Sequence, residues 1–460
     1  MANLLDLPAE LFQMIIHELV LIAMEPPPDF HYRFKIGPVW KLRGVSRSFA
    51  AEIEREFFSQ QPREFYSDNP NIKYLVQKYL PRFLMQVSRK PGSVNERFLT
   101  RLQDMGRYVV DQLDCEDQEQ RAEIIEKTYV GLGTIFGKAN ITHALWCDHI
   151  GNCHCSKFHD TALALSVPYP DRLCAALATG AHSVLPKILP KLSVTDKDGL
   201  IPTEPLRFAL LLDDLTSLDI ILRHLETRPS PEQIVLTQNA NMFSISERIL
   251  STLGSMRSTA TKLLLDYYEK NLPCPSKDTY TRWISNAAFH RSIDELQDLR
   301  AVLSFNTGRK SLVGRDAIAA VCAHGSSAGI QEVLQHVGDV NKGTVLTAPI
   351  FIAVRSGRAA AIQACLTVGA NVDLSVRSNI KTIGKTHITP LDVAVHRYDV
   401  PIADALIEGD ATIPHISHWP THARMYRLLH AATSRLTDVQ LPDLQHFKLW
   451  TKEDLQALQY

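Results

Sequence analysis

The sequence lacks a net charge of either sign. Its 49 lysines and arginines are balanced by 50 aspartates and glutamates, so the formal charge is −1 over 460 residues. Proteins that bind nucleic acids or anionic membranes through electrostatics carry a basic excess. The chain as a whole has no such excess, and we expect no nucleic-acid partner.

Long apolar runs are also absent. No run reaches the roughly 18–20 residues of a membrane-spanning helix, so no membrane partner is expected. Residues 1–6 contain no basic stretch ahead of an apolar run, which argues against a signal peptide. The eight cysteines are scattered rather than grouped as a disulfide framework. This spacing favours reduced thiols and a cytoplasmic or nuclear protein.

The composition nevertheless provides enough apolar residues for a folded protein. Hydrophobic residues make up 45% of the chain and charged residues 22%, which is typical of globular proteins. At this length one ordinary core is not enough, so about three domains or a repeat array are expected. Internal repeats decide between these two organisations.

Residues 348–373 form the clearest internal unit, with the sequence APIFIAVRSGRAAAIQACLTVGANVD. Pro349 suits the first turn of a helix, where its missing N–H costs nothing. Gly357 allows a reversal into a second short helix, and Gly369 ends that helix in the left-handed conformation. A helix pair this small cannot bury its apolar face alone, so it must stack on similar units.

This unit closely resembles an ankyrin repeat, whose pattern is Thr-Pro-Leu-His-x-Ala, then Gly, paired Leu and Gly-Ala-Asp-Val-Asn. Ala348 stands in the place of the Thr and Phe351 in that of the His, while Asn371 and Asp373 match the turn residues. The resemblance implies an all-α solenoid that binds other proteins through its concave face.

Related stretches recur at the ankyrin period of 33 residues. Ala176 and Ala209 are 33 residues apart, and so are Ala287, Ala320 and Ala353. We therefore predict about seven ankyrin-like repeats over residues 171–413, several of them degenerate. The pattern fades over residues 228–282, and terminal capping helices are expected over residues 414–460.

The N-terminal region predicts a small helical module over residues 1–58. A first helix is expected within residues 4–23, and a second runs from Val39 to about residue 58 as one continuous helix. In the second helix, apolar residues are spaced to form one face. They are Leu42, Val45, Phe49, Ile53 and Phe57.

Two segments of this module resemble an F-box, the three-helix module that docks onto the small adaptor of SCF-type cullin ubiquitin ligases. The first is Leu7-Pro8-x-Glu10-Leu11 and the second is Leu42-Arg43-x-Val45-Ser46. An insert over residues 25–37 lengthens the link between the matched segments. The resemblance implies that five residues contribute to adaptor contact or to packing of the module. They are Leu7, Pro8, Leu11, Ile15 and Val45.

Residues 59–170 are expected to form a linker and a helical spacer. A polar, proline-containing boundary is expected over residues 59–72. Amphipathic spacing then predicts helices over residues 97–113 and 120–129.

A cysteine- and histidine-rich loop is the strongest chemical signal. Thiolates and imidazoles in one loop are the ligands that tetrahedral zinc selects. However, Cys153 and Cys155 are too close for a CxxC turn, and a polar surface loop remains the alternative. The residues concerned are Cys147, His149, Cys153, Cys155 and His159.

Two further strings resemble catalytic motifs only in letters. Residues 325–329 match G-x-S-x-G, but they follow a helix-forming stretch rather than the strand that a nucleophile elbow needs. Gly131, Gly133 and Gly137 lack the spacing and the βαβ context of a phosphate loop. A paired carboxylate, Asp213-Asp214, is expected to be solvated in a turn between repeat helices.

We therefore predict no catalytic residues, no cofactor and no enzyme. The sequence predicts a protein-interaction protein, with an SCF-type substrate receptor as the leading hypothesis. In it, the N-terminal module binds the adaptor and the repeats bind a target protein. The alternatives are an ankyrin-type scaffold without a ubiquitin link and a zinc-binding protein acting through residues 147–159.

Overall fold

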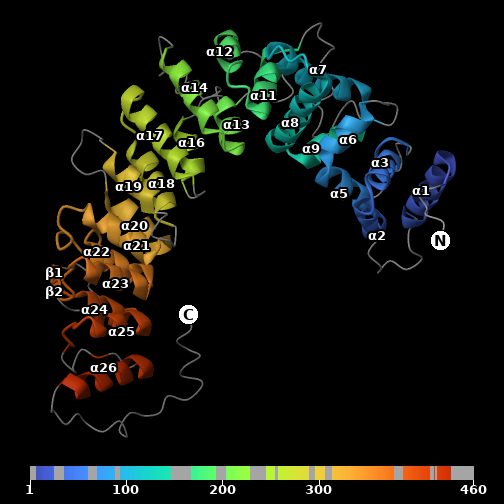
Figure 1. Ribbon diagram of the computed structural model, residues 1–460. Helices are drawn as coiled ribbons and strands as arrows, with labels where there is room; N and C mark the ends of the chain where they lie inside the picture. Colours follow the sequence, from blue (N-terminus) through green and yellow to red (C-terminus); the bar gives the residue numbers. More distant parts are fainter. Residues whose placement is uncertain are drawn as a thin grey trace. The chain divides into compact units, whose positions relative to one another are not determined.

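The computed structural model is predominantly helical, as predicted (Figure 1). It describes residues 7–24, 36–60, 70–88, 94–146, 167–192, 204–227, 245–253, 257–289, 296–305, 313–377, 387–414, 419 and 422–436. Strand structure in these ranges is limited to β1 (Val376–Arg377) and β2 (His387–Ile388). The two strands pair antiparallel, with Val376 opposite Ile388.

The chain divides into two compact units, Met1–Ser244 and Ile245–Tyr460. The division falls within residues 228–282, where the 33-residue pattern fades in the sequence. Each unit has its own buried apolar residues, and the two are described separately below.

The first unit begins with a module of short helices. They are α1 (Ala9–Met24), α2 (Ile36–Lys41), the 3₁₀ turn η2 (Leu42–Gly44), α3 (Arg47–Arg55) and the π-helical turn η3 (Glu56–Gln60). The helix α1 packs on α2, α3 and η3. Most of the predicted insert, residues 25–35, lies outside the described residues, and α2 already begins at Ile36.

The predicted continuous helix from Val39 to residue 58 is wrong, because the chain breaks before α3. Ser46 has extended backbone angles, with φ −159° and ψ 166°, and its side chain accepts a hydrogen bond from the Phe49 N–H. A serine in this position satisfies an otherwise unpaired helix donor and starts a new helix. Phe49, Ile53 and Phe57 are buried as predicted, but Val45 is 60% exposed.

Aromatic contacts join this module to the helices that follow. Trp40 lies 5.6 Å from Phe58 between ring centroids, and Phe58 lies 5.5 Å from Phe83. Phe83 in turn lies 5.7 Å from Trp146. Edge-on aromatic pairs of this kind contribute beyond the area they bury, so the module is packed against the rest of its unit.

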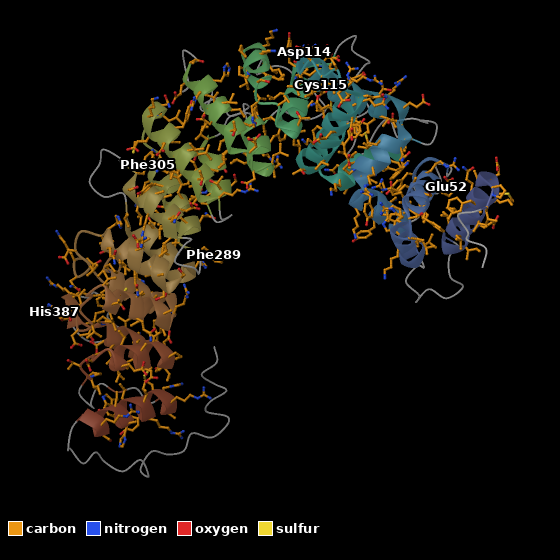
Figure 2. The ribbon with its side chains drawn as sticks, in the orientation of Figure 1. Glu52, Asp114, Cys115, Phe289, Phe305 and His387 are labelled. Atoms are coloured by element: carbon orange, nitrogen blue, oxygen red, sulfur yellow. The ribbon has the colours of Figure 1, made fainter. Side chains whose placement is uncertain are left out.

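The predicted spacer is a group of packed helices. They are α5 (Pro70–Lys78), α6 (Leu80–Val87), α7 (Glu96–Gln112), α8 (Gln118–Phe136) and α9 (Lys138–Trp146). The helix predicted over residues 97–113 is confirmed as α7, and the one predicted over 120–129 extends further as α8. Asp114 and Cys115 mark the turn between them (Figure 2), where Asp114 has φ 49°.

Two helix pairs complete the described part of the first unit. They consist of α11 (Tyr169–Thr179) with α12 (Leu185–Ile188) and its 3₁₀ extension η5 (Leu189–Lys191), then α13 (Pro205–Leu211) with α14 (Leu215–Glu226). The helix α11 packs on both α8 and α13, and α12 packs on α14. The left-handed residues between the helices of each pair, Gly180 and Asp213, are 33 positions apart.

The second unit consists of successive helix pairs followed by α26. The helices are α16 (Ile245–Thr252), α17 (Ser258–Asn271), α18 (Lys277–Ala287), α19 (Leu296–Ser304), α20 (Arg315–His324), α21 (Ser327–Gln335), α22 (Pro349–Ser356), α23 (Ala359–Thr367), α24 (Pro390–His396), α25 (Val400–Glu408) and α26 (Ala423–Leu436). The first helices of neighbouring pairs pack on each other, and so do the second helices. This arrangement produces two rows of helices (Figure 1).

Polar turn residues connect neighbouring pairs at one end of these rows. The Asn341 side chain accepts a hydrogen bond from the Asn371 N–H at 2.6 Å and donates one to the Gly369 carbonyl. Asp373 accepts bonds from both the N–H and the hydroxyl of Thr412. The amide and carboxylate positions that match the ankyrin turn thus link one pair to the next.

Candidate protein-interaction surface

The helix α1 has apolar residues on two sides. Ile16 and Val20, at 1% and 0% exposure, face the inside of the module. Phe12 also packs inward, with its ring 5.0 Å from that of Phe49 in an edge-on arrangement. The other apolar residues face away, and Met14 and Ile22 are 63% and 59% exposed.

The outward side of α1 borders a shallow apolar groove of about 470 Å³. Glu18 is the one charged residue in its lining. The remaining lining residues are Leu7, Leu11, Met14, Ile15, Leu19 and Ile22. They recur every three or four positions, which places them along one side of the helix. We call this set, with Glu18, the α1 groove.

The structure brings three of the five predicted adaptor-contact residues together in this groove. Leu11 is 47% exposed, while Leu7 and Ile15 are half-buried. Pro8 is exposed just before α1, where its carbonyl accepts the first helical hydrogen bond from Phe12. Val45 is exposed in the break between η2 and α3 and does not line the groove.

Sequence reasoning missed Met14 and Ile22. Both belong to the same broad apolar stripe as Leu11 and Ile15, so the pattern was visible. It did not show which half of the stripe would be buried, because that depends on where α2 and α3 pack.

Charged groups support the module from behind. Glu54 pairs with Arg43 and, at 2.8 Å, with Arg82 of α6. The Arg43 guanidinium also lies 4.2 Å from the centre of the Trp40 ring, a favourable cation–π arrangement. These contacts fix α3 against α2 and α6 while the groove on α1 stays apolar.

The predicted zinc ligands lie outside the described residues. Among the residues that the structure does describe, no group of three or more histidines, cysteines and carboxylates could hold a metal. Zinc content of the purified chain after chelation and dialysis tests the hypothesis, and a metal-free protein excludes it.

Buried cysteines in the helix pairs are poor nucleophiles. Burial raises the pKa of the Cys322 thiol to about 12, and it raises the pKa values of Cys174 and Cys365 as well. A thiol reacts as the thiolate, so these residues stay protonated near neutral pH and contribute to the core.

The G-x-S-x-G string forms a turn between α20 and α21, as predicted. The Ser326 side chain accepts a hydrogen bond from the Gly329 N–H, and the Ser326 N–H donates to the Ala288 carbonyl. A Cβ on Gly329 would lie 2.6 Å from that carbonyl oxygen. The glycine is therefore explained by close packing on the preceding pair.

Asp214 differs from the solvated carboxylate that we predicted. It is the N-cap of α14 and accepts hydrogen bonds from Ser217 and, at 2.9 Å, from His182 of the preceding pair. Burial alone would raise its pKa, but these hydrogen bonds outweigh burial and lower the pKa below its ordinary value.

Comparison with known protein families, curated protein sequences and solved structures finds no match for this chain. Within the described ranges, no helix combines the length and apolar character needed to cross a membrane. The argument for function therefore depends on the α1 groove and on the stacked helix pairs.

Proposed function

We propose that this chain is a non-enzymatic protein-interaction protein, the substrate-receptor subunit of an SCF-type ubiquitin ligase. Its N-terminal module binds the ligase adaptor through the α1 groove. Its helix pairs, which resemble ankyrin repeats, bind the target protein. The observation that carries the proposal is the outward apolar side of α1.

Exposed aliphatic residues in one continuous stripe favour a protein partner. Contiguous apolar surface is uncommon on soluble proteins and marks interaction sites. Leu11, Met14 and Ile22 present such a stripe on one helix, the form in which a helix packs into a partner's groove. Leu7, Leu11 and Ile15 are also the residues that the F-box resemblance assigns to this contact.

The packing behind α1 suits a receptor. The aromatic contacts from Trp40 through Phe58 and Phe83 to Trp146 attach the module to α6 and α9. A partner held on the α1 groove is therefore held on the body of the first unit. Joining two binding surfaces in one chain raises the effective concentration of target near ligase, and the chain itself forms no covalent bond.

The second candidate is an ankyrin-type scaffold without a ubiquitin link. It is favoured by the inward side of α1, where Phe12, Ile16 and Val20 pack as they would in a capping helix. Repeat arrays need such caps at their ends. Adaptor binding separates the two candidates.

The test is binding of the full-length chain to purified SCF adaptor, measured by co-elution and calorimetry. We expect Leu7→Ala/Leu11→Ala to lower affinity about tenfold or more, since each removed side chain loses a roughly 1.5 kcal/mol apolar contact. Leu21→Ala is the matched control, because Leu21 is 37% exposed on the same helix and does not line the groove. A wild-type chain that fails to bind the adaptor leaves the scaffold as the function.

A further inference from the structure

We infer that a second groove, formed by α8, α11 and α13, binds a short partner segment that combines an aliphatic side chain with a neighbouring lysine or arginine. The groove has a volume of about 470 Å³ and opens where α8 meets the C-terminal ends of α11 and α13. No residue of α1 lines it, so the inference is independent of adaptor binding.

Aliphatic side chains form the floor of this groove. Val130 of α8 is 49% exposed and Leu211 of α13 is 37% exposed, with Leu212 and Ala178 between them in the lining. The three helices contact one another, so these side chains lie on one continuous surface. Water contact at such side chains is unfavourable, and a partner's aliphatic group would relieve it.

The close approach of α8 to α11 shapes the groove. A Cβ on Gly131 would lie 2.2 Å from the Ala178 carbonyl oxygen, so only glycine permits this contact. The backbones meet at the bottom, and the larger side chains of Val130 and Leu211 stand beside the contact. The volume lies within the range of about 300–1,000 Å³ that ligand sites occupy.

The rim of the groove is acidic. Glu123 pairs with Lys127 at 2.8 Å, which leaves Glu126 as the second carboxylate in the lining. Glu126 makes no ion pair or hydrogen bond with any other residue in the described part of the chain. An uncompensated carboxylate beside an apolar floor favours a cationic neighbour and disfavours an acidic one.

The experiment measures fluorescence anisotropy of three fluorescein-labelled octapeptides with the full-length chain. One peptide has a central Leu-Leu pair flanked by lysines. The second has glutamates in place of the lysines, and the third keeps the lysines but has serines in place of the leucines. We expect the first peptide to bind at least about tenfold more tightly than the other two.

Two exposed substitutions assign that binding to the groove. Val130→Asp is expected to weaken the Leu-Leu-lysine peptide about tenfold, and Glu126→Lys to reverse the preference toward the glutamate peptide. Tyr74→Asp is the matched control, because Tyr74 is 64% exposed on α5, outside the groove. Circular dichroism confirms that each variant is folded.

Equal affinity for all three peptides, or affinity unchanged by both groove variants, would overturn the inference. Adaptor binding is measured separately with the Leu7→Ala/Leu11→Ala variant. Failure of one proposal is therefore distinguishable from failure of the other.

Discussion

Asp214 shows how one residue can join neighbouring helix pairs. Its carboxylate caps α14 through the Ser217 N–H and also accepts a hydrogen bond from His182. Its folded-state pKa is lowered, so the ionised carboxylate stabilises the fold above the unfolded-state pKa. That contribution is lost as the pH falls through the folded-state pKa.

We predict that Asp214→Ala lowers the free energy of unfolding by about 1 kcal/mol at pH 7, the usual cost of losing an N-cap. The difference from wild type should shrink below about pH 4, where the wild-type carboxylate also becomes protonated. Urea denaturation at several pH values measures both effects.

Asp219→Ala is the control for this prediction. Asp219 pairs with Arg223 one turn away on the surface of α14, and such pairs contribute about 0.3–0.5 kcal/mol. A deficit in Asp214→Ala that stays constant from pH 3.5 to pH 7 would assign the effect to packing instead of charge.

At the scale of elements, the contact between α8 and α11 depends on a missing side chain. Gly131 faces the backbone of Ala178. We predict that Gly131→Ala destabilises the first unit by about 1–3 kcal/mol, because the added Cβ overpacks a backbone contact. Thermal and urea unfolding followed by circular dichroism measure this change.

Gly133 provides a matched control on the same helix. A Cβ there would lie 3.5 Å from its nearest neighbour, Lys138, which is an ordinary contact. Gly133→Ala should therefore be neutral or stabilise the helix by up to about 1 kcal/mol through helix propensity. Equal behaviour of the two variants would contradict the role assigned to Gly131.

The same glycines show where sequence reasoning stopped. Periodicity predicted α7 to within one residue and the existence of α8, but not that α8 continues through Gly131 and Gly133. Glycine is unfavourable inside an isolated helix. The contact that favours it here comes from α11, which begins more than 30 residues later and leaves no local trace in the sequence.

The candidate site was predicted in part for a similar reason. The spacing of Leu7, Leu11 and Ile15 identified the α1 groove, whereas Met14 and Ile22 were missed. The helix break at Ser46 was also missed, because the apolar pattern across it favoured one long helix. A serine cap is a local signal that outweighed that pattern.

At the scale of the whole molecule, the 33-residue ladder corresponds to helix pairs in both units. Gly180 and Asp213 occupy equivalent left-handed turns in the first unit. In the second unit Gly357 and Tyr398 do so, and residues 378–386 account for their wider separation. The degenerate stretch around Ile249 also forms a helix pair, α16 with α17.

Because each unit has its own core, we predict that residues 245–460 fold when expressed alone. Trp283 and Ile284 are buried in this unit at 1% and 0% exposure, and its helices pack in two rows within residues 245–436. Circular dichroism should show a helical spectrum and a cooperative unfolding transition. A spectrum without helix would mean that the first unit is required for folding.

The tryptophans of this chain provide an optical label for each unit. Trp40 contacts Phe57, Phe58 and Tyr79 where the N-terminal module meets α5. Trp283 is enclosed by Tyr268 and Phe305 in the other unit (Figure 2). Emission from a Trp283→Phe variant would therefore follow the first unit, and its wavelength would reveal whether the module stays packed when a partner occupies α1.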